Sequence, residues 1–200
     1  MKMRSALLLM LWGMALTSPA QAFDGREQAN ATLIAALPAS CPHDVVQWTQ
    51  EDIPINLGHI FCGEIASGRK AKGLHARPNG DAPAILLHME MVLTPDAQGV
   101  YAARITLAQD GRSAEKYSSF FPDHCDAHAV VASIRHAARH PSACPANAPR
   151  WASCGPGAPM KMAVEDAQKS GFCMGEDGSV IDIAIGYLQD GRINTAFPPR

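Results

Sequence analysis

Residues 85–107 read Ile85-Leu-Leu-His-Met-Glu-Met-Val-Leu93, Thr94-Pro-Asp-Ala-Gln98 and Gly99-Val-Tyr-Ala-Ala-Arg-Ile-Thr-Leu107. This stretch has the clearest strand pattern in the chain. The two outer runs are rich in residues that favour strands, and a proline and a glycine mark the link between them. This pattern predicts an antiparallel hairpin. The run Lys116-Tyr-Ser-Ser-Phe-Phe-Pro122 is expected to follow as a short strand that leads into a turn.

Two segments outside the hairpin have the pattern of a helix. Residues 26–36 end at Leu37-Pro38, and proline stops helical hydrogen bonding. Residues 126–140 begin at Asp126, a residue type that caps helices, and end just before Pro141. One face of the second segment is apolar and comprises Ala127, Val130, Val131, Ile134 and Ala138. We expect this amphipathic helix to pack on a sheet.

The last third of the chain is expected to be mostly strands. Residues 141–160 hold five of the 15 prolines and two cysteines, which indicates an irregular insert. Strands are predicted around Phe172–Met174 and Val180–Tyr187, and a turn at Gln189–Gly191 precedes a last strand at 192–197. Early helices followed by antiparallel sheets predict the α+β fold class.

Residues 1–22 have the pattern of a secretory signal peptide. Two basic residues precede an apolar run over Ala6–Leu16, and an Ala-x-Ala cleavage site ends at Ala22. The apolar run is shorter than the about 20 residues that a membrane-spanning helix needs, and no later stretch is long or apolar enough to form one. We expect a soluble protein without a membrane anchor that starts near Phe23 and is periplasmic or secreted.

Residues 23–200 are expected to form a single domain, since their number suits one core and no internal repeat divides them. The formal net charge is −2, and loss of Lys2 and Arg4 with the signal peptide lowers it by two, to −4. Such a charge excludes broad electrostatic coating of nucleic acid but allows a local anion site.

All cysteines lie after the predicted cleavage site. An even number in an exported chain predicts up to three disulfides, for which the sequence leaves 15 pairings. We favour Cys144 with Cys154, because the loop between them is rich in proline and glycine. The six are Cys41, Cys62, Cys125, Cys144, Cys154 and Cys173.

Two histidines flank a short basic segment in Gly58-His-Ile-Phe-Cys-Gly-Glu64 and Gly73-Leu-His75. With an unperturbed pKa of about 6.5, one histidine accepts a proton and another donates one near neutrality. Four cations lie between and just after the pair: Arg69, Lys70, Lys72 and Arg77. The arrangement suits acid–base cleavage of a phosphodiester.

A second histidine group favours a metal interpretation on spacing alone. His136 and His140 are one helical turn apart, Cys144 follows, and His124-Cys125-x-x-His128 lies upstream. However, no Cys-x-x-Cys signature is present, and an oxidising destination favours disulfides. Solvated histidines on a helix face are the preferred interpretation, and no metal ligands are assigned.

Three separated segments, spanning residues 58–198, together resemble a known family. The first is His59-Ile-Phe-Cys-Gly-Glu64 with Gly73-Leu-His75, and the second is Lys116-Tyr-Ser-Ser-Phe-Phe-Pro122. The third is Gly186-Tyr followed by Gly191-Arg-Ile-Asn-Thr-Ala-Phe-Pro198. The ordered set resembles the bacterial branch of the EndoU-like endoribonucleases, related to the animal poly(U)-specific and the coronavirus uridylate-specific enzymes. The resemblance implies a catalytic domain with two sheets, similar to ribonuclease A.

The resemblance also implies an endoribonuclease that cleaves RNA at uridylates, by attack of the ribose 2′-hydroxyl that leaves a 2′,3′-cyclic phosphate. It assigns His75 as base, His59 as acid and Lys116 as the cation that stabilises the charged oxygens, and the two histidine roles could be exchanged. DNA lacks the 2′-hydroxyl and should stay uncut.

Further residues are assigned to substrate binding. The resemblance implies that Ser118 or Ser119 lies near the uracil, and that Thr195 occupies the place of the family's last active-site residue, which is Thr in bacterial members and Tyr in viral ones. The basic segment adds Arg69, Lys70 and Lys72. Glu64 is interpreted as structural. We interpret Phe120, Phe121 and Phe197 as core residues.

Two alternatives stay open. One is a secreted module that binds RNA or another polyanion with the same fold and no turnover, and the other is a zinc-stabilised structural domain. For the preferred enzyme we expect a monomer that binds RNA and needs no cofactor, with no requirement for manganese. An inhibitor or immunity protein is a further candidate partner, because members of the family often act as toxins.

Overall fold

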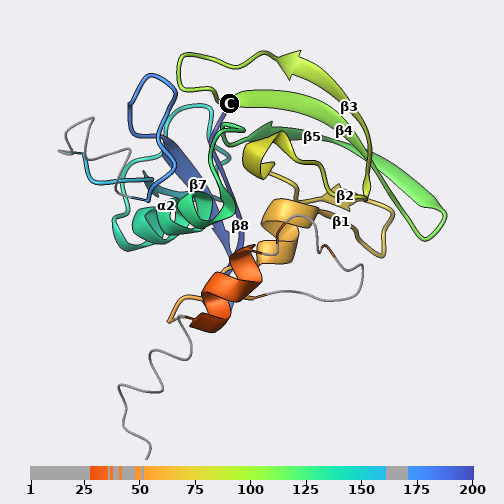
Figure 1. Ribbon diagram of the computed structural model, residues 1–200, viewed down its shortest axis with the longest axis horizontal. Coiled ribbons are helices and arrows are strands. Elements are labelled where there is room, and N and C mark those ends of the chain that lie inside the picture. The colour runs from red at the N-terminus through yellow and green to blue at the C-terminus, as the bar shows by residue number, and fades with distance from the viewer. Residues whose placement is uncertain (1–27, 36, 38–40, 42–47, 51, 161–170) are drawn as a thin grey trace, which may run out of the picture.

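The computed structural model describes residues 28–35, 37, 41, 48–50, 52–160 and 171–200. In these residues the chain forms three antiparallel sheets and one long helix (Figure 1). This confirms the predicted α+β class. The predicted signal peptide lies outside the described residues, as do the ends of the predicted 26–36 helix, of which residues 28–35 are helical. No helix among the described residues is long and apolar enough to cross a membrane.

The first sheet consists of β3 (Leu86–Leu93), β4 (Tyr101–Gln109) and β5 (Arg112–Phe120), in that order. The predicted hairpin is confirmed as the antiparallel pair β3–β4. The prediction for β5 was too short, because the strand begins directly after a tight turn. Asp110 and Gly111 have φ values of 51° and 70° there, the left-handed pair that a two-residue hairpin turn requires.

The second sheet consists of β6 (Ser153–Pro156), β7 (Asp182–Tyr187) and β8 (Ile193–Phe197), again antiparallel and in chain order. β6 lies inside residues 141–160, which were expected to be irregular. The prolines of this segment mask the sequence pattern of a short edge strand. The predicted strand at 172–174 was wrong. Met174 forms a single isolated bridge there, with Val180.

The long helix α2 (Ala127–Arg139) covers the second sheet, as predicted (Figure 1). The Asp126 side chain accepts a 2.7 Å hydrogen bond from the Ala129 N–H and caps the helix. Gly155 of β6 lies so close that a Cβ at this position would overlap the Ala137 carbonyl oxygen. The absence of a side chain therefore lets the helix approach the strand backbone.

The segment between residues 52 and 80 joins the two sheets. It contains η1 (Gly58–Cys62), a turn of π-helix, and the two-residue ladder of β1 (Glu64–Ile65) with β2 (Ala71–Lys72). The short helix η2 (Pro78–Gly80) follows. Just before η1, Ile55 pairs with Ile193 of β8. η1 is thus attached to the second sheet while β1 and β2 lie beside the first.

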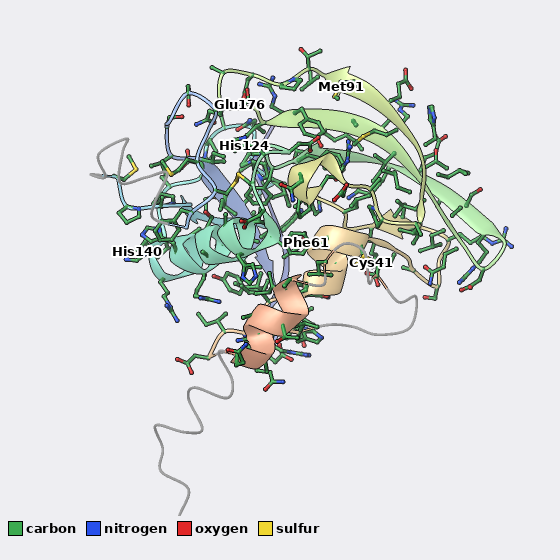
Figure 2. The ribbon with its side chains drawn as sticks, viewed as in Figure 1. Cys41, Phe61, Met91, His124, His140 and Glu176 are labelled. Carbon is green, nitrogen blue, oxygen red and sulfur yellow. A yellow bond between two sulfur atoms is a disulfide. The ribbon has the colours of Figure 1, made fainter. Side chains whose placement is uncertain are left out.

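The apolar core is divided between the two sheets. Residues of η1, α2, β7 and β8 form the larger cluster, and the first sheet with Leu74 forms the smaller one. Phe61 of η1 is fully buried in the larger cluster and lies near the middle of the molecule (Figure 2).

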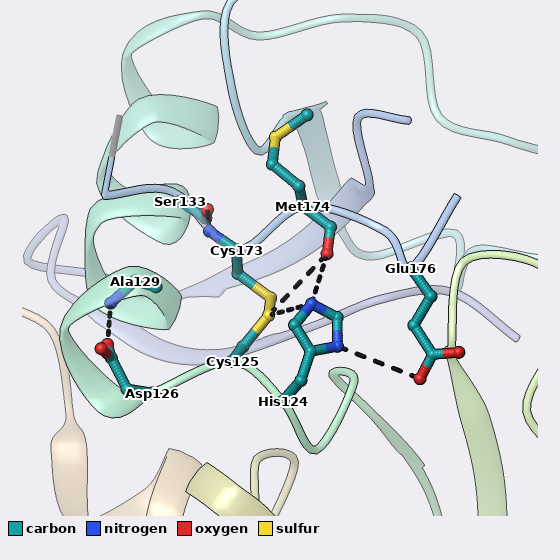
Figure 3. Close-up of a disulfide and its surroundings, with 8 residues drawn as sticks. All are labelled: His124, Cys125, Asp126, Ala129, Ser133, Cys173, Met174 and Glu176. Atoms are coloured by element: carbon teal, nitrogen blue, oxygen red, sulfur yellow. Dashed lines mark hydrogen bonds and ion pairs between the residues drawn. A yellow bond between two sulfur atoms is a disulfide. The ribbon is translucent and has the colours of Figure 1, made fainter. Parts of the chain in front are cut away.

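Three disulfides pair all six cysteines: Cys41 with Cys62, Cys125 with Cys173, and Cys144 with Cys154. The last pairing confirms the sequence prediction. The second joins the start of α2 to the segment before β7, where His124 Nε2 lies 3.1 Å from the Met174 carbonyl oxygen (Figure 3).

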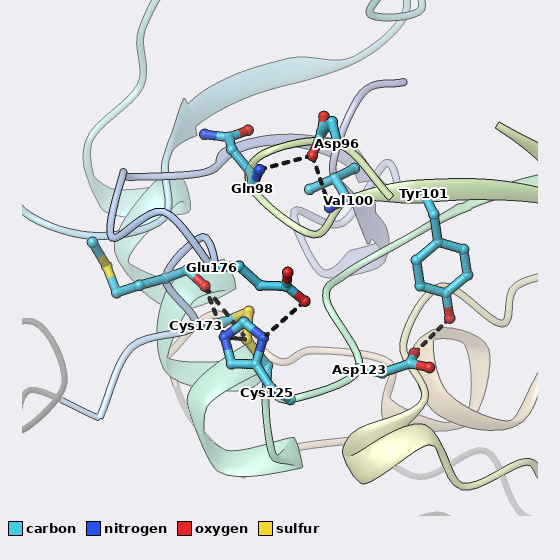
Figure 4. A network of polar contacts seen from close by, with 10 residues as sticks. Asp96, Gln98, Val100, Tyr101, Asp123, Cys125, Cys173 and Glu176 are labelled. Atoms are coloured by element: carbon cyan, nitrogen blue, oxygen red, sulfur yellow. Dashed lines mark hydrogen bonds and ion pairs between the residues drawn. A yellow bond between two sulfur atoms is a disulfide. The ribbon is translucent and has the colours of Figure 1, made fainter. Parts of the chain in front are cut away.

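Two aspartate side chains stabilise connections of the first sheet: Asp96 in the β3–β4 turn and Asp123 in the segment after β5. Asp96 accepts hydrogen bonds of 3.0 Å from the backbone N–H groups of Gln98 and Val100, which closes the β3–β4 turn (Figure 4). Tyr101 donates a 2.6 Å hydrogen bond to Asp123 and links β4 to the segment after β5.

Candidate active site

His59 is held by η1. Its backbone N–H donates a 3.0 Å hydrogen bond to the side-chain oxygen of Asn56, so this asparagine satisfies a free donor of the short helix. Cys62, at the end of η1, is tied to Cys41. The His59 side chain is mostly buried, and its ring lies next to Glu64 at the edge of the site.

Residues 73–75 pack directly on the backbone of η1. The Leu74 N–H donates to the His59 carbonyl, and the His75 N–H donates to the Ile60 carbonyl, both at 2.7 Å. Gly73 has φ of 69°, and a Cβ there would overlap the His59 carbonyl oxygen. Only glycine fits this contact. The two histidine-bearing segments are therefore positioned against each other by backbone hydrogen bonds.

His75 is buried, and the hydrogen-bond partners of its Nδ1 are neutral. Its Nδ1 lies 3.1 Å from the Ser119 carbonyl oxygen and 3.1 Å from Ser118 Oγ. A carbonyl only accepts, so Nδ1 carries the proton and Nε2 keeps its lone pair. Burial, with smaller contributions from the positive charges of Lys116 and His59, holds the pKa of His75 well below its ordinary value of 6.5. The ring is thus neutral at pH 7.

His59 has a charged partner instead. Its Nδ1 lies 3.2 Å from Oε1 of Glu64, whose side chain is about half exposed. The hydrogen bond from His59 is the largest cause that lowers the pKa of Glu64, so this carboxylate stays ionised. The centroids of the His59 and His75 rings are 6.2 Å apart.

Lys116 of β5 reaches the histidine-bearing loop from the first sheet. Its Nζ donates to the Gly73 carbonyl oxygen at 2.6 Å and to Ser118 Oγ at 3.2 Å, and both are neutral oxygens. Ser118 Oγ donates onward to the Leu74 carbonyl at 2.7 Å. Burial lowers the pKa of Lys116 to about 8.

β8 carries Thr195 and brings Phe197 to His75. The Phe197 ring stacks on His75, with centroids 4.9 Å apart and planes 25° from parallel. Phe197 is only partly buried, which corrects its interpretation as a core residue, whereas Phe120 and Phe121 are core residues as expected. The buried Oγ1 of Thr195 has no hydrogen-bond partner among the described residues.

The cations of the basic segment lie in different surroundings. Lys72 pairs across the small ladder with Glu64, and its charge contributes to the lowered pKa of that carboxylate. Arg69 and Lys70 are exposed in the turn between β1 and β2. The Arg77 guanidinium contacts other residues: its Nη1 lies 3.1 Å from Met89 Sδ, and its Nη2 lies 3.8 Å from Asp123.

The cysteines of the second histidine group are not free thiols. Cys125 and Cys144 are both in disulfides. The His136 ring stacks on that of His140, and its Nδ1 lies 2.8 Å from the Pro156 carbonyl oxygen. In the described parts of the chain, no three His, Cys, Asp or Glu side chains are grouped as a metal site would require.

The structure brings together His59, His75, Lys116 and Ser118 from three separate segments, and Phe197 of β8 packs on His75 from a fourth. Thr195 lies two residues before Phe197 in the same strand. Sequence reasoning missed Asn56, which supports His59, and it misassigned Phe197. For Phe197 a signal existed, because it stands between Thr195 and Pro198 in the third family-like segment. Asn56 carried none, since its role depends on the fold of η1.

Comparison with known protein families gives a match over most of the chain. The family model described as Bacterial EndoU nuclease matches residues 55–200. The match starts just before η1 and runs to the last residue, so it includes every site residue described above. Neither the curated proteins nor the solved structures contain a match.

Proposed function

The chain belongs to the bacterial EndoU nuclease family, and from this premise we propose that it is an exported endoribonuclease that cleaves RNA at uridylates. The ribose 2′-hydroxyl attacks the adjacent phosphorus, the 5′-oxygen of the next nucleotide leaves, and the products end in a 2′,3′-cyclic phosphate. Three disulfides support an oxidising, periplasmic or extracellular destination.

The observation that carries the proposal is a pair of histidines with opposite surroundings beside a buried lysine. An in-line displacement at phosphorus needs a base at the attacking oxygen, an acid at the leaving oxygen and a cation where charge develops. Two rings 6.2 Å apart can approach opposite oxygens of one phosphate. Their hydrogen-bond partners support a different role for each.

His75 acts as the base. Its Nδ1 proton is engaged by the Ser119 carbonyl, and the lowered pKa keeps the ring neutral, so Nε2 is free to accept the 2′-hydroxyl proton. The loop that carries it is held by backbone hydrogen bonds to η1, which keeps Nε2 in place during the reaction.

His59 acts as the acid and donates a proton to the leaving 5′-oxygen. Glu64 accepts from Nδ1, fixes the orientation of the ring and faces it with a negative charge. Nε2 is then the nitrogen that delivers the proton. Lys116 stabilises the extra negative charge on the non-bridging oxygens, and its burial strengthens this attraction.

Thr195 and the serines of β5 are proposed to face the nucleotide. The Thr195 hydroxyl without a partner among the described residues is suited to bind a base edge. The Ser118 hydroxyl supports His75 and Lys116 from beneath, and contact of Ser118 or Ser119 with uracil stays a prediction. Arg69, Lys70 and Lys72 would attract the flanking phosphates, and the reaction is proposed to need no metal.

The test is cleavage of a fluorogenic oligonucleotide that has one ribouridine in an otherwise deoxy strand, with oxidised protein and with or without EDTA. We expect cutting at the uridine that survives EDTA, gives a cyclic phosphate by mass spectrometry, and is lost in His59→Ala and His75→Ala. His88→Ala, which removes an exposed histidine of β3, is the matched control and should cut normally. Failure of well-folded protein to cut this strand and mixed-sequence RNA would refute the proposal.

A further inference from the structure

Trp151 is a large aromatic residue left in solvent beside the site. Its side chain is 62% exposed. It lies in the turn that the Ala152 N–H closes on the Pro149 carbonyl, immediately before β6. In the register of the second sheet Ser153 pairs with Ile185 of β7, so the turn faces the end of that strand. Burying such a side chain is favourable, which makes its exposure informative.

The indole of Trp151 packs against Gly186 of β7. A Cβ built on Gly186 would lie 2.8 Å from Trp151 Cζ3 and 2.7 Å from Thr195 Cγ2, closer than side chains tolerate. The missing side chain of Gly186 therefore makes room for the ring next to Thr195. One part of the indole packs on the sheet, and the rest stays open.

The same ring continues a row of aromatic rings that reaches the catalytic pair. Its centroid is 6.0 Å from that of Phe197 in an edge-to-face arrangement, and Phe197 stacks on His75. The row approaches the site from the side of His75, the ring assigned to the 2′-hydroxyl. The Thr195 side chain lies beside the indole through its Cγ2, and its buried hydroxyl has no partner among the described residues.

The loop that carries Trp151 is held at both ends. Cys144 and Cys154 close it over ten residues, and Ser142 pairs with Cys154. β6 in turn touches the backbone of α2 through Gly155. The indole is therefore presented by a constrained loop, so less conformational entropy is lost when a ligand contacts it.

We propose that Trp151 forms a stacking subsite for the uracil of the nucleotide whose 2′-hydroxyl attacks, with the Thr195 hydroxyl at the edge of the base. The inference rests on the proposed ribonuclease function. Aromatic rings bind bases by stacking whatever the sequence, and indole has the largest face among the side chains. The disulfide-closed insert is then a substrate-binding element.

The test combines a protein change with a substrate change. Trp151→Ala should raise KM about tenfold on the single-ribouridine strand, with little change in kcat, because stacking one base commonly contributes affinity of this order. The same variant should have no effect on a strand with an abasic ribose at the cleavage position. It should keep its full effect on a strand with an abasic deoxyribose one nucleotide downstream. Trp151→Phe should restore most of the affinity.

A binding measurement separates this inference from turnover. The chain has three tryptophans, so in a Trp12→Phe/Trp48→Phe variant of the full chain Trp151 is the remaining one. An uncleavable strand with one deoxyuridine should quench its fluorescence, and the strand with an abasic site in that place should not. Quenching without cleavage in any assay would refute the ribonuclease and keep the subsite. Equal quenching by both strands, or an equal KM increase with and without the base, would overturn the subsite.

Discussion

His75 and His59 lie 6.2 Å apart, yet their halves of the site are built differently. The His75 half is buried and has neutral partners, namely a carbonyl and a serine hydroxyl, and it shares that serine with Lys116. The His59 half opens to solvent through the half-exposed carboxylate of Glu64. The two rings are equally buried, each 7% exposed, so the opposite roles that we propose for them rest on their different hydrogen-bond partners.

The largest effect should come from removing either ring. His75→Ala and His59→Ala should each lower kcat by about 10²- to 10⁴-fold, the range of general acid–base catalysis. A substrate with sulfur in place of the leaving 5′-oxygen needs no acid, because a thiolate leaves unaided. On it, His59→Ala should recover most of its activity and His75→Ala should not. Recovery by His75→Ala instead would show that His75 is the acid and His59 the base.

Lys116 should come next. Lys116→Met should lower kcat by about 10²- to 10³-fold, since it removes the charge that stabilises the phosphorane. The pKa of about 8 adds a pH test: the lysine is charged below that value, so on the 5′-thio substrate, which needs no proton from His59, wild-type kcat/KM should fall as pH rises through about 8.

Arginine offers the matched variant, because its pKa is above 12 at any surface or buried position. On the 5′-thio substrate, Lys116→Arg should keep part of the activity and lose the alkaline decline near pH 8. If the decline persisted unchanged in this variant, another group would be responsible and the assigned role of Lys116 would be wrong.

A smaller effect is expected at the open half. Glu64→Gln keeps the shape of the side chain but removes its charge, and should lower kcat about tenfold, the equivalent of a hydrogen bond to a charged group. The alkaline decline caused by Lys116 should stay in place. Glu90→Gln, at an exposed carboxylate on β3, is the control. A loss as large as that of His59→Ala would contradict this modest contribution and would mean that the orientation and tautomer of His59 set by Glu64 are essential for proton transfer.

The smallest effect is expected at Ser118, which lies next to His75 in the buried half of the site. Ser118→Ala removes a hydroxyl that bonds the Leu74 carbonyl and lies within reach of Lys116 and His75. We expect a loss of a few-fold in kcat and about 1 kcal/mol in the free energy of unfolding, measured by urea denaturation. Ser113→Ala, at an exposed position of the same strand, should change neither. An unchanged Ser118→Ala would show that this network does not hold the site.

Patterns with a local cause were readable from the sequence. The hairpin, the helix with its Asp126 cap and the Cys144–Cys154 disulfide follow from alternation, capping and a short loop. Elements without a local signature were missed or cut short. β6 is hidden among prolines, β5 begins at a turn of Asp110 and Gly111, and the bridge at Met174 is too small to be a strand.

The fold class, the family and the candidates His59, His75 and Lys116 follow from the sequence, because motifs depend on residue type and spacing. Only the tertiary structure decided what surrounds each of them there. Which nitrogen of His75 carries the proton depends on the Ser119 carbonyl, 44 residues away in the chain. The row of rings from Trp151 through Phe197 to His75 depends on the pairing of β6, β7 and β8. Burial, charge and contact are properties of neighbours in space, and folding alone brings those neighbours together.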